Sequence, residues 1–191
     1  LIHLNCFFPF LSNILDNLAE NYDIELAAIY NIKNFGKWTV GRPKNLKIID
    51  IQWENEIYVK EFPKIDIGIV PALIPTFINK TNFINNFLFN TNDYDYLNRY
   101  KISSNPGRLY PFALYKIPVV ADCIPSHMQK IIHEKTGFIA FNNYGWYHSL
   151  EKLILSKKLR NKIGNNFFKT TSNILSPTKA KDDLLANIKN A

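Results

Sequence analysis

The chain has 191 residues, of which 47% are hydrophobic and 20% charged. These values favour one globular domain with a substantial core and exclude a disordered or low-complexity chain. Lys and Arg number 23 against 16 Asp and Glu, a formal net charge of +7. That excess favours anionic partners, namely a nucleotide diphosphate, nucleic acid or an anionic membrane surface.

The cysteines and histidines show no ligand spacing. Cys6 and Cys123 lie far apart without a CxxC pair, so the sequence predicts neither a disulfide framework nor a cysteine metal site. A reducing, cytoplasmic location is the simplest interpretation. The four histidines also lack metal-ligand spacing, so no metal is expected. They are His3, His127, His133 and His148.

No apolar run approaches the roughly 18 to 20 residues that a membrane-spanning helix needs. We therefore expect a soluble domain, with peripheral attachment to a membrane as an alternative. The chain begins at Leu1 without a basic region before an apolar stretch, unlike a signal peptide. We expect it to be a piece of a longer protein.

In the first part of the chain, continuous apolar runs alternate with helical patterns. Strands are predicted over residues 1–6, 24–30, 46–51 and 65–70. Helices are predicted from Ser12 onward and over residues 54–62. Residues 72–100 mix Asn with aromatic residues and show no clean period.

The same alternation continues to the end of the chain. A helix over residues 108–115 is predicted to open at Asn105, Pro106 and Gly107. Further strands are expected over residues 118–121 and 137–141. Further helices are expected over residues 127–133, 146–155, 159–171 and 176–191.

This alternation predicts an α/β fold with a doubly wound, mainly parallel, Rossmann-like sheet in a single domain. Strands that read as continuous apolar runs require helices on both faces of the sheet, and about six strands are expected. Ligands of such sheets bind at the carboxyl ends of the strands.

The segment from Lys101 to Arg108 combines two cations, two hydroxyl groups and a helix start. An anion is attracted by the unpaired N–H groups of a helix start, and an Arg side chain offers a bidentate fork. The segment is therefore a candidate diphosphate site, with a capped helix and surface charges as the alternative. The candidate residues are Lys101, Ser103, Ser104, Asn105, Gly107 and Arg108.

Several segments together resemble the carboxyl-terminal, nucleotide-sugar-binding domain of GT-B glycosyltransferases of the group 1 type. They are Asp66–Pro71, Lys101–Arg108, Lys116–Ala121, Thr136–Phe138, Trp146 and Leu159–Gly164. The resemblance spans residues 1–191, including the terminal helix, and implies that an amino-terminal acceptor domain is missing.

The resemblance implies a glycosyltransferase half, inactive by itself, that binds a nucleoside-diphosphate sugar as donor substrate without a cofactor. Lys and Arg would stabilise the leaving diphosphate, work that needs no metal. Many retaining members carry a Glu-x7-Glu pair where Ser103 and Pro111 stand here. No catalytic residue is therefore assigned.

The resemblance also places the nucleotide base at the loop after the third predicted strand, at Ile51, Gln52 and Trp53. Trp53 could stack on the base, although packing is the commoner role of a tryptophan. Asp50, at the end of the third predicted strand, is a feature of phospho-receiver domains as well. That interpretation is excluded, because such a domain needs an acidic pair after the first strand, where Asn5 and Cys6 stand.

Two other functions remain open. A nucleotide-sugar epimerase shares the GT-B architecture, and a non-catalytic basic module could bind RNA or an anionic membrane. Five lysines and one arginine spaced along a helix face support the basic module. A solvated helix surface explains these residues as well, and no specific nucleic acid is expected as a partner. They are Lys152, Lys157, Lys158, Arg160, Lys162 and Lys169.

Overall fold

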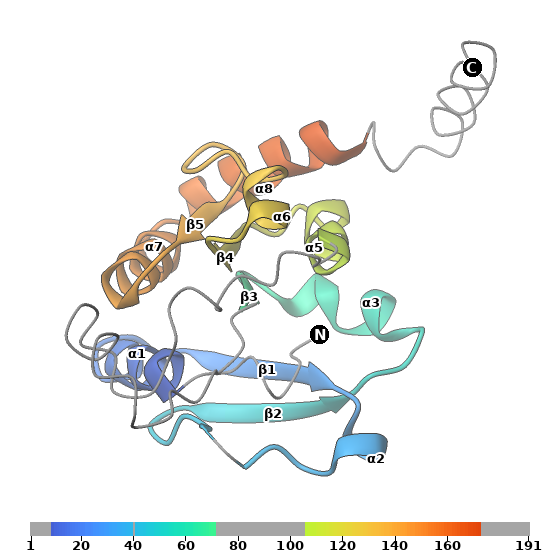
Figure 1. Ribbon diagram of the computed structural model, residues 1–191, viewed down its shortest axis with the longest axis vertical. Coiled ribbons are helices and arrows are strands. Elements are labelled where there is room, and N and C mark those ends of the chain that lie inside the picture. Colours follow the sequence, from blue (N-terminus) through green and yellow to red (C-terminus); the bar gives the residue numbers. More distant parts are fainter. Residues whose placement is uncertain (1–8, 40, 72–105, 173–191) are drawn as a thin grey trace, which may run out of the picture.

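The computed structural model describes residues 9–39, 41–71 and 106–172. Three predictions fall outside these ranges: the strand over residues 1–6, the terminal helix over residues 176–191, and the diphosphate candidates Lys101, Ser103, Ser104 and Asn105. The described chain is a mixed α/β structure whose strands are all parallel to their neighbours (Figure 1).

The first sheet pairs β1 (Glu25–Tyr30) with β2 (Lys47–Gln52). The register runs from Glu25 opposite Lys47 to Tyr30 opposite Gln52. Helix α1 (Pro9–Ala19) precedes β1, and the short helix α2 (Ile32–Phe35) follows it. Asn31 caps α2 by accepting a hydrogen bond from the backbone N–H of Asn34.

The second sheet has the order β3-β4-β5. Its strands are β3 (Gly68–Val70), β4 (Val119–Asp122) and β5 (Phe138–Ala140). All four residues of β4 are buried because the strand lies in the middle of its sheet. Helix α3 (Ile57–Lys60) and the 3-10 turn η2 (Phe62–Lys64) precede β3.

Helical segments connect and follow these strands. The 3-10 turn η4 (Pro106–Arg108) runs directly into α5 (Leu109–Leu114), which leads to β4. Helix α6 (Pro125–Met128) joins β4 to β5, and α7 (Asn143–Leu155) and α8 (Lys157–Ser172) follow β5.

Two buried clusters show that helices cover both faces of the sheets. Successive residues of β4 point to opposite faces, so Val120 packs with α1, β1 and α7, whereas Val119 and Ala121 pack with α5 and Phe167 of α8. The first cluster includes residues of both sheets, among them Leu26 of β1. The two sheets therefore share one core, and the predicted α/β class is confirmed.

The prediction of one continuous sheet differs from the described structure, which has two separate sheets of two and three strands. Strand β3 is also shorter than predicted, because residues 65–67 pair with no described strand.

The short helices were predicted less accurately than the strands. The helix predicted over residues 54–62 is divided into α3 and η2, since Pro63 cannot donate a hydrogen bond within a continuing helix. The helix predicted over residues 127–133 begins earlier, with Pro125 in its first turn, and ends at Met128. Helix α1 likewise begins at Pro9 rather than near Ser12.

Candidate functional site

The carboxyl ends of β3, β4 and β5 are where the parallel arrangement predicts a ligand. Arg108, at the end of η4, lies at this edge: its Nη1 donates a hydrogen bond of 3.0 Å to the carbonyl oxygen of Pro71, the residue that follows β3. The side chain of Arg108 is half-buried. Arg108 thus lies beside the residue that follows β3, and its binding of a diphosphate stays a prediction.

Arg108 also has a structural role. Its hydrogen bond joins the start of α5 to the end of β3, two segments 37 residues apart. A guanidinium group carries five N–H donors, and one of them makes this contact with Pro71.

Asp122 ends the central strand and is 1% exposed. Its Oδ1 accepts a hydrogen bond of 3.1 Å from the indole Nε1 of Trp146, and its backbone oxygen accepts one of 2.9 Å from the N–H of Ile124. The bond from Ile124 lies in the turn from β4 into α6, and the bond from Trp146 joins the end of β4 to α7. The resemblance had singled out Trp146 by position, and its hydrogen bond to this carboxylate gives the position a physical role.

His127 lies in α6 and is 1% exposed. Its Nδ1 is 2.9 Å from the carbonyl oxygen of Asp122. Burial lowers the pKa of His127 to about 4, with a smaller lowering from the charge of Arg108, so the ring is neutral at pH 7. Because a carbonyl only accepts, the proton of the neutral ring lies on Nδ1, and Nε2 is a hydrogen-bond acceptor.

Cys123, next to Asp122, is not activated for chemistry. Burial, aided by the charge of Asp122, raises the pKa of its thiol above the ordinary value, so the nucleophilic thiolate is disfavoured. Cys123 and His127 are therefore both uncharged at pH 7.

Gly107, the remaining described member of the predicted diphosphate set, is exposed in η4 immediately before Arg108. It therefore lies beside the same sheet edge. Whether it contacts phosphate stays a prediction.

The three residues predicted to hold a base have packing contacts in the structure. Ile51 and Trp53 are half-buried against one cluster, and the Trp53 ring meets that of Tyr58 edge-on at 5.0 Å between centroids. The side chain of Gln52 donates to the carbonyl of Trp53 at 2.8 Å and accepts from the N–H of Lys33 at 3.0 Å. Base binding by these residues stays a prediction.

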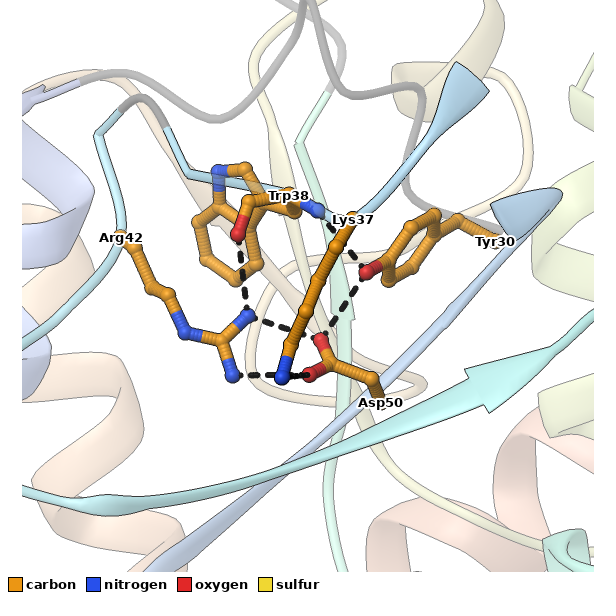
Figure 2. A network of polar contacts seen from close by, with 5 residues as sticks. All are labelled: Tyr30, Lys37, Trp38, Arg42 and Asp50. Atoms are coloured by element: carbon orange, nitrogen blue, oxygen red, sulfur yellow. Dashed lines mark hydrogen bonds and ion pairs between the residues drawn. The ribbon is translucent and has the colours of Figure 1, made fainter. Parts of the chain in front are cut away.

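Sequence reasoning missed a polar network on the first sheet (Figure 2). Arg42 donates from Nη1 and Nη2 to the two carboxylate oxygens of Asp50, at 2.8 and 2.9 Å. The hydroxyl of Tyr30 donates to Asp50 at 3.1 Å and accepts from the N–H of Trp38 at 3.0 Å, and Lys37 lies 3.7 Å from the same carboxylate.

The network joins the loop before β2 to both strands of the first sheet. The guanidinium of Arg42 holds the pKa of Asp50 below its ordinary value, with help from Tyr30 and Lys37 and against the effect of burial. Each carboxylate oxygen already has partners, so a structural role explains the cluster. The sequence did carry one signal, since a carboxylate within an apolar strand needs a partner.

Residues 9–39, 41–71 and 106–172 contain no group of three or more His, Cys, Asp or Glu side chains placed to hold a metal ion. In the same ranges, no helix combines the length and the apolar character needed to cross a bilayer.

Comparison with solved structures finds distant structural similarity. The chain is similar to the C-terminal domain of a glycosyl transferase group 1 family protein (LpcC) from Francisella tularensis, with 14% identity and a TM-score of 0.38. The similarity covers 90% of this chain and 97% of that one. No protein-family model and no curated protein matches the sequence. A likeness this distant assigns neither a family nor a ligand.

Proposed function

We propose that this chain is the donor-binding domain of a glycosyltransferase and takes a nucleoside-diphosphate sugar at the carboxyl edge of the β3-β4-β5 sheet. The observation that carries the proposal is the position of Arg108, a half-buried cation hydrogen-bonded to the carbonyl that follows β3. Open parallel sheets bind their ligands at this edge, and a guanidinium matches the geometry of phosphate oxygens.

The cation at this edge supports an anionic ligand, beside the buried carboxylate of Asp122 at the end of the neighbouring strand β4. Cleavage of the bond between the sugar's anomeric carbon and the diphosphate leaves negative charge on the departing phosphate oxygen, while the acceptor oxygen bonds to the same carbon. Arg108 stabilises that charge as it develops. His127 is neutral at pH 7, so its ring adds no second cation to this edge.

The other predicted contacts complete the proposed site. Lys101, Ser103, Ser104, Asn105 and Gly107 precede Arg108 in sequence and would share the diphosphate with it. Ile51 and Gln52 at the end of β2, with Trp53 after them, would face the base. An amino-terminal domain would provide the acceptor and the general base, and this half alone would be inactive.

A thermal-shift screen against UDP-, GDP-, ADP- and CMP-linked sugars tests the proposal. A ligand that binds only the folded state raises the melting temperature, and one donor class should do so in a saturable manner. The free sugar is the control. Failure of all four donor classes at millimolar concentration would contradict the proposal.

A salt titration of binding separates donor binding from the basic-module alternative. Non-specific binding of RNA weakens steeply with salt because many counterions are released, whereas one diphosphate releases few. Binding of single-stranded RNA that greatly exceeds nucleotide binding at low salt would favour the alternative.

A further inference from the structure

One ring nitrogen of the buried His127 has no hydrogen-bond partner. Its Nδ1 is 2.9 Å from the carbonyl oxygen of Asp122, whereas its Nε2 makes no hydrogen bond to any residue in the described ranges 9–39, 41–71 and 106–172. Because Nδ1 carries the proton of the neutral ring, Nε2 presents a lone pair and can only accept. A buried acceptor without a partner is unfavourable, so it points to a ligand or a water that completes it.

A small group from outside the protein can reach this nitrogen. Among the described residues, no fully enclosed side-chain nitrogen or oxygen lacks a hydrogen-bond partner. His127 as a whole is 1% exposed, so its small exposed part includes Nε2. The opening is therefore narrow, and it suits a single hydroxyl group.

The chemistry of Nε2 selects the kind of atom that it binds. A lone pair attracts an O–H or N–H donor and repels the oxygens of an ionised phosphate, which only accept. Burial lowers the pKa of His127 to about 4, so the ring is neutral and this selection holds at pH 7. A sugar carries several hydroxyl donors, and a nucleoside-diphosphate sugar joins them to the anion that Arg108 would hold.

The position of His127 suits the sugar end of such a donor. His127 lies in α6, which follows β4, and Arg108 lies beside the end of the neighbouring strand β3. Figure 1 shows β1 and β2 on the other side of β3, away from β4 and β5. A base at the end of β2, a diphosphate at Arg108 and a sugar at His127 would thus follow one another in the order in which they are linked.

We propose that Nε2 of His127 accepts a hydrogen bond from a hydroxyl group of the donor's sugar and thereby helps to select that sugar. The inference rests on the proposed function, because the diphosphate at Arg108 brings the sugar to this nitrogen. The contact is a hydrogen bond without proton transfer. His127 therefore acts on the binding of the sugar and takes no part in bond cleavage.

Two substitutions separate this contact from the bond that the same ring makes to Asp122. The side-chain amide of His127→Asn can replace Nδ1 as the donor to the Asp122 carbonyl, but it leaves no atom at the place of Nε2. His127→Gln does the reverse, because its longer side chain brings an amide oxygen toward the place of Nε2. Circular dichroism and thermal unfolding verify that both variants fold.

Isothermal titration with UDP, UDP-glucose, GDP and GDP-mannose measures the affinity that a sugar adds to each nucleoside diphosphate. One nucleotide sugar should bind the parent more tightly than its nucleoside diphosphate does. His127→Asn should reduce this gain by about 3- to 10-fold, the range for one hydrogen bond, while the affinity for the nucleoside diphosphate stays within about twofold. His127→Gln should restore much of the gain.

The inference is overturned if neither sugar adds affinity in the parent, or if the sugar adds as much in His127→Asn as in the parent. It is also overturned if His127→Asn weakens the nucleotide sugar and the nucleoside diphosphate by the same factor, which is the result of a purely structural role. Failure of both nucleoside diphosphates to bind the parent would contradict the proposed function itself, and this inference with it.

Discussion

Gly164 of α8 packs directly against the backbone carbonyl of Lys116, the residue that follows the C-cap of α5. A β-carbon at residue 164 would overlap that oxygen, and the nearby backbone N–H of Ile117 would be within 3.4 Å. The absence of a side chain at Gly164 thus lets α8 approach the end of α5, with which it packs closely. This contact explains why residue 164 is a glycine. In the sequence, Gly164 stood out only as the end of a segment that carries the family resemblance.

Gly164→Ala should destabilise the fold by about 3 kcal/mol or more, because backbone atoms cannot yield as a flexible side chain would. Chemical denaturation measures the change. Lys162→Ala, at an exposed position of the same helix, is the control and should stay within about 0.5 kcal/mol of the parent. A Gly164→Ala variant as stable as the control would show that the helices can separate at no cost.

Lys116 adopts a φ of 57°, the left-handed region that favours glycine. Its N–H bonds to the carbonyl of Ala113 and that of Ile117 to the carbonyl of Phe112, the pattern of a Schellman motif at the end of α5. Lys116→Gly should therefore stabilise the fold by about 0.5–1 kcal/mol, after loss of the cation–π contact with Phe168.

Lys116→Ala separates the two effects in the same denaturation measurement. This variant keeps the left-handed strain and loses the contact with Phe168, so it should be slightly less stable than the parent. If the glycine variant were no more stable than the alanine variant, backbone strain at residue 116 would be excluded as the cause.

Asp50→Asn should cost about 2 kcal/mol at pH 7, because the charge-assisted bonds from Arg42 are weakened. The folded pKa of Asp50 is lowered, so its contribution is complete above the unfolded pKa of about 3.9 and is lost as the pH falls through the folded value. The stability gap between parent and variant should hence be constant above about pH 5 and narrow below about pH 4.

Urea denaturation at pH 7 and pH 3.5 tests this dependence. Asp23→Asn is the control, since Asp23 is exposed and the change should have little effect at either pH. If the stability difference between the parent and Asp50→Asn were the same at both pH values, the charge of Asp50 would be excluded as the source of the network's contribution.

The buried His127 should give the folding stability a different dependence on pH. Its folded pKa of about 4 lies below the unfolded value of about 6.5, so between these limits only the unfolded state takes up the proton. Stability should fall by about 3 kcal/mol as the pH drops from 6.5 to 4, and His127→Gln should remove most of that slope. An NMR titration of the imidazole measures the pKa directly, and a value near 6.5 would contradict the burial argument.

The strands were predicted well because they are continuous apolar runs, and β1, β2, β4 and β5 lie within one or two residues of their predicted bounds. The short segments around Pro63 and Pro125 were predicted less well, since their ends depend on tertiary contacts as well as on local patterns. One such contact is that of Phe62 in η2 with Phe112 of α5, whose ring centroids are 5.0 Å apart.

The candidate site was only partly predictable. Local patterns marked Arg108 as a candidate phosphate ligand, because a cation at a helix start is visible in sequence, and this role stays a prediction. The clustering of Asp122, His127 and Trp146 was not visible, because β4, α6 and α7 meet only in the folded chain. For the same reason, the pairing of Arg42 with Asp50 depends on how the loop before β2 returns to the sheet.

Isothermal titration of nucleoside diphosphates tests the central claim most directly. UDP and GDP are titrated into the parent and into Arg108→Ala, Arg108→Lys and Lys158→Ala, with circular dichroism to verify folding. Arg108→Ala also loses the bond to Pro71, so a stability loss of about 1–2 kcal/mol is expected alongside the binding effect.

UDP or GDP is expected to bind the parent, and Arg108→Ala should weaken that binding by about 10- to 100-fold. Arg108→Lys should retain part of the affinity, since it keeps the charge without the fork. Lys158→Ala, at an exposed position of α8, should bind as the parent does, and the free nucleoside should distinguish none of the variants. A folded Arg108→Ala protein that binds the diphosphate as tightly as the parent would contradict the assignment of this sheet edge as the donor site.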